Sequence, residues 1–207
     1  MTLTEQLAEA GPRLSARVLA EMYADPFWAA RFGERGRHHA RNDGELHLKY
    51  LAEALDSNSV TVFSSYAHWL RELLVSRGMC SRHLAENFTL LADAIEAEPW
   101  SDRARAIEIL RAGADSLRYT TGPAAALEAL RAVTPDPPAD TLLSYLADAL
   151  AFDQPGWFAG YIAFAATLRP SLGAELAALR RRIASEATNP VPALAVLDRA
   201  VAAMEVR

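Results

Sequence analysis

Histidine and cysteine are the side chains that most often bind metals or move protons near neutral pH, and this chain of 207 residues carries all of them before residue 84. They are His38, His39, His47, His68, Cys80 and His83. A histidine in a partly apolar interior can bind haem or a metal, act as a proton-linked switch, or hydrogen-bond to a neighbouring side chain. Any chemistry beyond folding is therefore expected in residues 31–83.

His47 is the first candidate among these histidines. Asp43 and Tyr50 lie four residues before it and three residues after it, so all three side chains share one face of an expected helix. His39 lies two turns earlier on the same spacing. We predict a ligand-binding site formed by His47, Asp43, Tyr50 and His39. Ligand or metal contact, catalysis, and a buried histidine bonded to a neighbour such as Asp43 all remain open.

The sequence does not predict a metal centre. Metal sites in helical bundles use Glu-x-x-His motifs, and none occurs in this chain. Cys80 and His83 supply two ligand types, whereas a closed zinc site needs four. Phosphate-binding loops, nucleophile elbows and dinucleotide fingerprints are absent as well. The cofactor and the catalytic residues therefore stay unknown, and the sequence favours a protein without enzymatic activity.

A cluster of basic residues precedes His47. It contains Arg31, Arg35, Arg37, Arg41 and two histidines, opposed only by Glu34. Because the planar arginine fork suits carboxylates and phosphates, we predict that Arg35, Arg37 and Arg41 contact a partner. A solvated basic face is the alternative interpretation.

Composition and charge exclude several classes of function. The net charge of −5 argues against a nucleic-acid partner, because non-specific binding depends on many contacts of Lys and Arg with phosphate. No segment has the roughly 18 apolar residues of a membrane span. The single cysteine and the lack of a basic or apolar leader predict a cytoplasmic protein.

Apolar residues recur at spacings of three and four through most of the chain, which predicts an all-α fold. Expected breaks lie at Asp25-Pro26, Gly78 and Thr121-Gly122-Pro123, and residues 33–45 are ambiguous because they contain several helix-weakening residues. We expect helices over 2–24, from Phe27 onward, and over 43–56, 60–77, 81–98, 101–119, 139–152, 156–168, 171–187 and 191–205.

The chain contains an internal repeat. Residues 50–55 (Tyr-Leu-Ala-Glu-Ala-Leu) match residues 145–150 (Tyr-Leu-Ala-Asp-Ala-Leu), and Phe63 and Tyr66 match Phe158 and Tyr161 at the same separation. In this alignment His47 corresponds to Leu142 and His68 corresponds to Ala163. Because the position of His47 is occupied by an apolar leucine in the second copy, His47 is expected to point toward an interior. We predict two tandem, degenerately repeated up-and-down helical bundles, over residues 1–98 and 99–207, packed as one compact body.

A family resemblance follows from the first copy of the repeat and the residues after it. The residues that carry it are 50–55, Phe63, Tyr66-Ala67, Trp69-Leu70, Arg77-Gly78, Leu84 and Leu91. Its pattern resembles the helical N-terminal sensor domains of bacterial stress-response regulators of the stressosome and partner-switching type. That resemblance implies a non-catalytic helical dimer that binds a protein partner or a small signal.

Two functions follow as hypotheses. The first is a non-enzymatic regulatory, ligand-sensing or protein-interaction module, a possible homodimer, with its contact surface in the first half of the chain. The alternative is a cofactor-binding or metal-binding protein, haem-like or other, or an enzyme, that uses His47.

Overall fold

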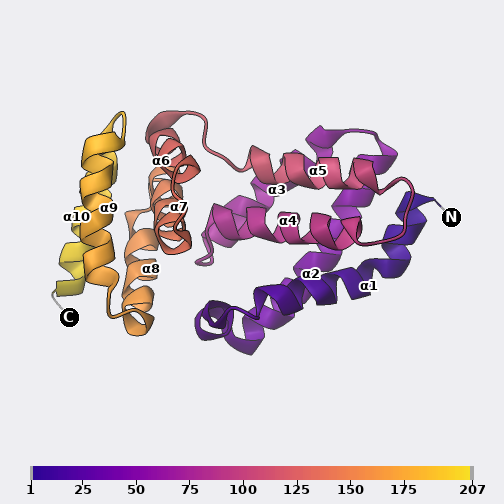
Figure 1. Cartoon of the computed structure of the whole chain (residues 1–207), viewed down its shortest axis with the longest axis horizontal. Helices are drawn as coiled ribbons and strands as arrows, with labels where there is room; N and C mark the ends of the chain where they lie inside the picture. Colours follow the sequence, from indigo (N-terminus) through magenta and orange to yellow (C-terminus); the bar gives the residue numbers. More distant parts are fainter. Residues whose placement is uncertain (1, 206–207) are drawn as a thin grey trace. The chain divides into compact units, whose positions relative to one another are not determined.

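The computed structural model describes residues 2–205, which form helices joined by short turns without a strand among them (Figure 1). This confirms the all-α class that the helical spacing of apolar residues predicts. In chain order the helices are α1 (Leu3–Met22), α2 (Pro26–Asp56), α3 (Val60–Val75), α4 (Ser81–Glu96), α5 (Arg103–Ser116), α6 (Gly122–Ala132), α7 (Pro137–Ala151), α8 (Pro155–Leu168), α9 (Leu172–Glu186) and α10 (Pro190–Glu205).

The described residues divide into two compact units. Unit 1 contains residues 2–70 and 83–117, and unit 2 contains residues 71–82 and 118–205. Residues 71–82, which we call the strap, thus belong to unit 2 although they lie within the first half of the sequence. The sequence-based boundary between residues 98 and 99 places α5 in the second half, whereas its contacts group α5 with unit 1.

The start of α2 shows how local sequence sets the elements of unit 1. Asp25 caps the helix by accepting a hydrogen bond from the backbone N–H of Phe27 at 2.8 Å, with Pro26 at the first helical position. Within α2 only Gly33 leaves helical geometry, with φ of +57°, a conformation that favours glycine. The helix is therefore continuous from residue 34 to residue 56, which resolves the ambiguity of residues 33–45.

Several helix ends confirm the predicted breaks, and others differ. Gly78 has φ of +92° after the end of α3, as expected for a left-handed glycine there. Pro12 lies inside α1 without ending it. Helix α7 begins at Pro137, earlier than the proline-rich sequence suggests, because Asp136 caps it by accepting from the N–H of Ala139 at 3.1 Å.

Each unit has its own apolar core. In unit 1 the fully buried large side chains include Leu14, Leu51, Phe63, Phe88 and Leu110. In unit 2 the buried side chains include Leu127, Leu142, Leu146, Phe158, Ile162, Ile183 and Leu197. Burial of these side chains is the main favourable contribution to folding in both units.

Helix α5 approaches α3 closely at Gly113. A Cβ atom at this position would lie 2.5 Å from Cδ1 of the fully buried Phe63. We expect Gly113→Ala to lower the free energy of unfolding by about 2 kcal/mol, because overpacking outweighs the better helix propensity of alanine. Urea unfolding followed by circular dichroism measures the change.

Gly160, inside α8, is the matched control for this prediction. No atom lies within 4 Å of a Cβ at this exposed position. Gly160→Ala is expected to raise stability by up to about 1 kcal/mol. Equal effects of the two substitutions would contradict the close packing of α5 on Phe63.

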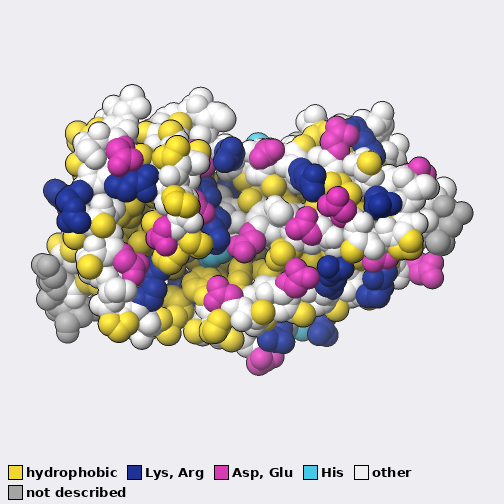
Figure 2. Space-filling view, in the orientation of Figure 1, with side chains coloured by type: hydrophobic (Ala, Val, Ile, Leu, Met, Phe, Trp, Pro, Cys, Tyr) yellow, Lys and Arg dark blue, Asp and Glu magenta, His cyan; other side chains and the backbone are white. Residues whose placement is uncertain are grey.

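The surface is mixed in charge. On the face drawn in Figure 2, basic and acidic side chains are interspersed on both units. None of the helices between residues 2 and 205 combines the length and the apolar character needed to cross a membrane.

Candidate functional site

The continuous part of α2 places Asp43, His47 and Tyr50 on one side of the helix, as their spacing predicts. His47 is buried, with 2% of its surface exposed, and Leu142, the residue aligned with it in the predicted repeat, is fully buried. Asp43 and Tyr50 are half-buried. The three side chains therefore run from the interior of unit 1 to its surface.

The partner of His47 comes from α3. Nδ1 of His47 lies 2.6 Å from the hydroxyl oxygen of Tyr66, and the Phe88 ring meets the imidazole edge to face. Burial lowers the pKa of His47 to about 3, so the ring is neutral near pH 7. Burial raises the pKa of Tyr66, and the negative charge of Asp43 raises it further. Asp43 therefore favours the protonated hydroxyl of the tyrosine that pairs with His47.

A small polar cavity lies beside His47. Ser15, Asn87 and Gly44 line it together with apolar residues, and its volume is about 10 Å³. The buried Oγ of Ser15 and Oδ1 of Asn87 have no protein hydrogen-bond partner, while Nδ2 of Asn87 donates to Sδ of Met22. A polar cavity of this volume suits one water molecule, whereas pockets for organic cofactors have about 300–1,000 Å³.

Tyr66, the partner of His47, also lines an open groove of about 480 Å³. The Tyr50 ring stacks on Tyr66 with centroids 4.1 Å apart, and Trp69 lies at the edge with 52% of its surface exposed. Such a groove offers flat aromatic surface beside hydroxyl groups, a combination typical of interaction sites. We call this surface the α2–α3 groove; its lining residues are Tyr50, Ser59, Thr61, Val62, Ser65, Tyr66 and Trp69.

The structure separates His39 and the basic cluster from His47. His39, Arg35 and Arg41 are exposed on α2. The guanidinium of Arg37 lies 4.4 Å from the centroid of the Tyr23 ring, and its Nε is 3.8 Å from Glu34. Arg37 is therefore partly engaged within unit 1, whereas Arg35 and Arg41 face solvent.

Sequence reasoning missed a buried acid in unit 2. Asp148 has 1% of its surface exposed, and its carboxylate accepts from the amide and hydroxyl of Ser81 at 2.7 and 2.5 Å and from the Tyr119 hydroxyl at 2.6 Å. Burial raises the pKa of Asp148, while these bonds and the positive charge of Arg71 act to lower it. The only sequence indication was its alignment with Glu53, which is exposed.

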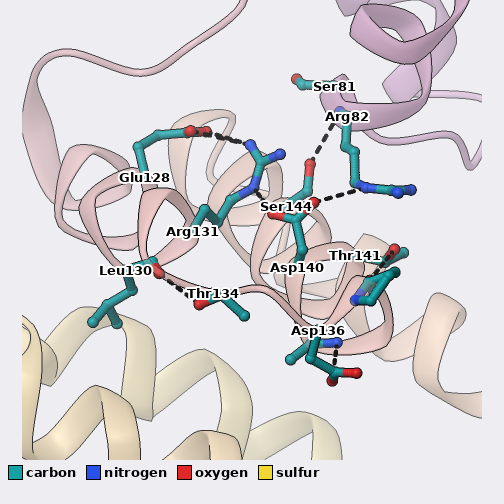
Figure 3. Close-up of polar contacts among 12 residues, drawn as sticks. Ser81, Arg82, Glu128, Leu130, Arg131, Thr134, Asp136, Asp140, Thr141 and Ser144 are labelled. Atoms are coloured by element: carbon teal, nitrogen blue, oxygen red, sulfur yellow. Dashed lines mark hydrogen bonds and ion pairs between the residues drawn. The ribbon is translucent and has the colours of Figure 1, made fainter.

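Ion pairs surround the same part of unit 2 (Figure 3). Nε of Arg131 donates to Asp140 at 2.8 Å, and its Nη1 donates to Glu128 at 2.9 Å. Asp140 also pairs with Nε of Arg82 at 2.7 Å, and the amide of Arg82 donates to the Ser144 hydroxyl at 3.1 Å. Each charge in this network has a partner, so its evident role is to hold the strap on α7.

Between residues 2 and 205, no three His, Cys, Asp or Glu side chains gather as a metal site requires. The described residues thus form an all-α protein with a groove at Tyr66 and a water-sized cavity beside His47. No family model, curated protein or solved structure matches the chain.

Proposed function

We propose that the chain is a non-enzymatic helical interaction module of regulatory type, built from two degenerate copies of one unit, with its contact surface at the α2–α3 groove. A regulatory role is what the resemblance to bacterial sensor domains implies. The observation that carries the proposal is the difference in exposure between Tyr50, which lines the groove, and the aligned Tyr145 of unit 2.

Matching geometry at a separation of 95 residues supports the two-copy organisation. Helices α2 and α7 end at the aligned positions 56 and 151, and α3 and α8 begin at the aligned residues Val60 and Pro155. The Tyr145 and Tyr161 rings stack with centroids 3.7 Å apart, as the Tyr50 and Tyr66 rings do at 4.1 Å.

The turns between these helices agree as well. Asn58 and Asp153 have φ of +47° and +51°. The next residue in each turn, Ser59 or Gln154, donates its amide to the carbonyl of Ala54 or Ala149, at 2.9 and 2.8 Å. This is the pattern of a left-handed helix cap, repeated at aligned positions.

The two stacked tyrosine pairs differ in what covers them. Tyr145 and Tyr161 are 2% and 3% exposed, and the Tyr145 hydroxyl donates to the strap at the Gly78 carbonyl, 2.9 Å away. Tyr50, by contrast, is half-buried at the open groove. An aromatic ring that is buried at Tyr145 and accessible at the aligned Tyr50 is suited to receive a partner.

The proposal is tested by capture of partners from an extract of the source cells. Tagged wild-type chain is compared with Trp69→Asp, which places a charge in the groove, and with Val191→Asp as the matched control. Val191 is 70% exposed and lies outside unit 1. We expect Trp69→Asp to reduce capture at least about tenfold, since a buried interface tryptophan contributes about 2 kcal/mol or more.

Identical partner sets for all three proteins would refute the groove as the contact surface. Joint replacement of Arg35, Arg37 and Arg41 by alanine in the same experiment tests the basic cluster. Loss of capture in that variant alone would show that the contact surface lies on the first part of α2 instead of at the groove.

A further inference from the structure

Three polar side chains from three helices meet at the small cavity beside His47. Ser15 comes from α1, His47 from α2 and Asn87 from α4, and all three belong to unit 1. They are buried, with 5%, 2% and 9% of their surfaces exposed, respectively. Buried polar groups need hydrogen-bond partners, because bulk solvent cannot supply them.

Two of these side chains have a polar atom that the protein itself does not satisfy. The hydroxyl of Ser15 bonds to no protein atom, not even to a carbonyl of its own helix, to which serine often donates. Asn87 uses Nδ2 to donate to Sδ of Met22, and its Oδ1 has no donor. Turning the amide over would not satisfy Oδ1, because the Met22 thioether has no proton to donate.

The hydrogen bond between His47 and Tyr66 indicates which imidazole nitrogen carries the proton. A neutral imidazole has one N–H group, and the phenol has one O–H group. If the Tyr66 hydroxyl donates to Nδ1, its proton is satisfied and the imidazole proton lies on Nε2. The reverse arrangement leaves the Tyr66 proton without an acceptor among the described residues, which is costly. His47 therefore has an Nε2–H donor available on the cavity that it lines.

The cavity matches one water molecule in size and in chemistry. Its volume of about 10 Å³ is close to the minimum that holds a single water. Among the described residues that line it, none is charged near pH 7, so an ion would lack the opposite charge that burial demands. A water molecule, by contrast, can accept from two donors and donate to an acceptor at the same time.

We propose that unit 1 binds one water molecule in this cavity, which accepts hydrogen bonds from Nε2–H of His47 and from the Ser15 hydroxyl and donates one to Oδ1 of Asn87. Three bonds are the usual number for a buried water. The water joins α1, α2 and α4, and it holds His47 in the Nε2–H tautomer. The site lies in the interior of unit 1, so it is independent of what binds at the α2–α3 groove.

Gly44 provides the space for this water. It lines the cavity, and a Cβ atom there would lie 3.0 Å from Oγ of Ser15. A side chain at residue 44 would therefore occupy space beside the hydroxyl that the water contacts. Gly44→Ala displaces the water by volume, whereas substitution of Ser15 and Asn87 removes its partners.

The first test is solution NMR of the isotope-labelled full chain. Long-range proton–nitrogen correlation reports the tautomer of each histidine, and His47→Leu assigns the signals of residue 47. We expect a proton on Nε2, an unprotonated Nδ1, and cross-relaxation between water and the Nε2 proton with the sign of a long-lived complex. The Nδ1–H tautomer, or an Nε2 proton that shows cross peaks to protein protons alone, would overturn the proposal.

Magnetic relaxation dispersion of the water signal provides the second test, because it counts long-lived internal waters. Ser15→Ala combined with Asn87→Leu should lose one such water, since His47 alone then remains as a polar partner, and Gly44→Ala should lose the same one. Thr89→Ala is the matched control: it removes an exposed hydroxyl from α4 and should keep the wild-type count. An unchanged count in both cavity variants contradicts the proposal, and the wild-type measurements decide it where a variant fails to fold.

Discussion

Asp148→Ala is expected to lower the free energy of unfolding by about 3–5 kcal/mol, because it leaves buried donors without an acceptor. The carboxylate receives the amide and hydroxyl of Ser81 and the hydroxyl of Tyr119, and Arg71 adds a nearby positive charge. None of these donors gains a replacement partner when the side chain ends at Cβ. Urea unfolding at pH 7, followed by circular dichroism and tryptophan fluorescence, measures the loss.

Glu53→Ala is the matched control, since Glu53 carries the carboxylate that aligns with Asp148 in the predicted repeat. Glu53 is exposed. Its removal should leave the unfolding curve close to that of the wild type. Similar losses in both variants would mean that burial of Asp148 under the strap contributes nothing specific to stability.

His47→Leu is expected to change the pH dependence of stability. The pKa of His47 is about 3 in the folded chain and near 6.5 in the unfolded chain, so the unfolded chain binds the proton more tightly. The wild type therefore loses stability as pH falls from about 6.5 toward 3, by about 2 kcal/mol at pH 5. Leucine, the residue at the aligned position 142, removes this contribution.

At pH 8 the same variant should be less stable than the wild type by about 1–3 kcal/mol, because the Tyr66 hydroxyl loses its partner. Between pH 8 and pH 5 the difference should shift by about 2 kcal/mol in favour of leucine. Unfolding curves at both pH values measure it, and His39→Leu controls for loss of an exposed imidazole. Parallel pH profiles for wild type and His47→Leu would contradict a buried neutral histidine.

Local signals in the sequence predict most helix boundaries. Asp25-Pro26 and Gly78 act through the backbone geometry of a few neighbouring residues, so their effects can be read without knowledge of the fold. The role of Gly44, by contrast, cannot be predicted from its neighbours in the sequence. A Cβ there would lie 3.0 Å from Cβ and Oγ of Ser15 in α1, so its small size serves a helix contact and not a turn.

The candidate site, too, could be predicted from the sequence only in part. Alignment with Leu142 predicts an inward-pointing His47, and the structure places it there, 2% exposed. Its pairing with Tyr66 depends on how α3 packs against α2, which the spacing along one helix does not contain. Asp148 was missed because its burial depends on Ser81, which lies 67 residues earlier.

The position of the strap also determines the order in which unit 2 is completed during synthesis. Ser81 leaves the ribosome 67 residues before Asp148, which at about 5–20 residues per second is a delay of roughly 3 to 13 seconds. Throughout that interval the Gly78 carbonyl lacks the Tyr145 hydroxyl that donates to it in the finished protein. The Ser81 hydroxyl likewise lacks the Asp148 carboxylate that accepts from it. No single cut in the sequence separates the two units, because a fragment starting at residue 118 lacks the strap.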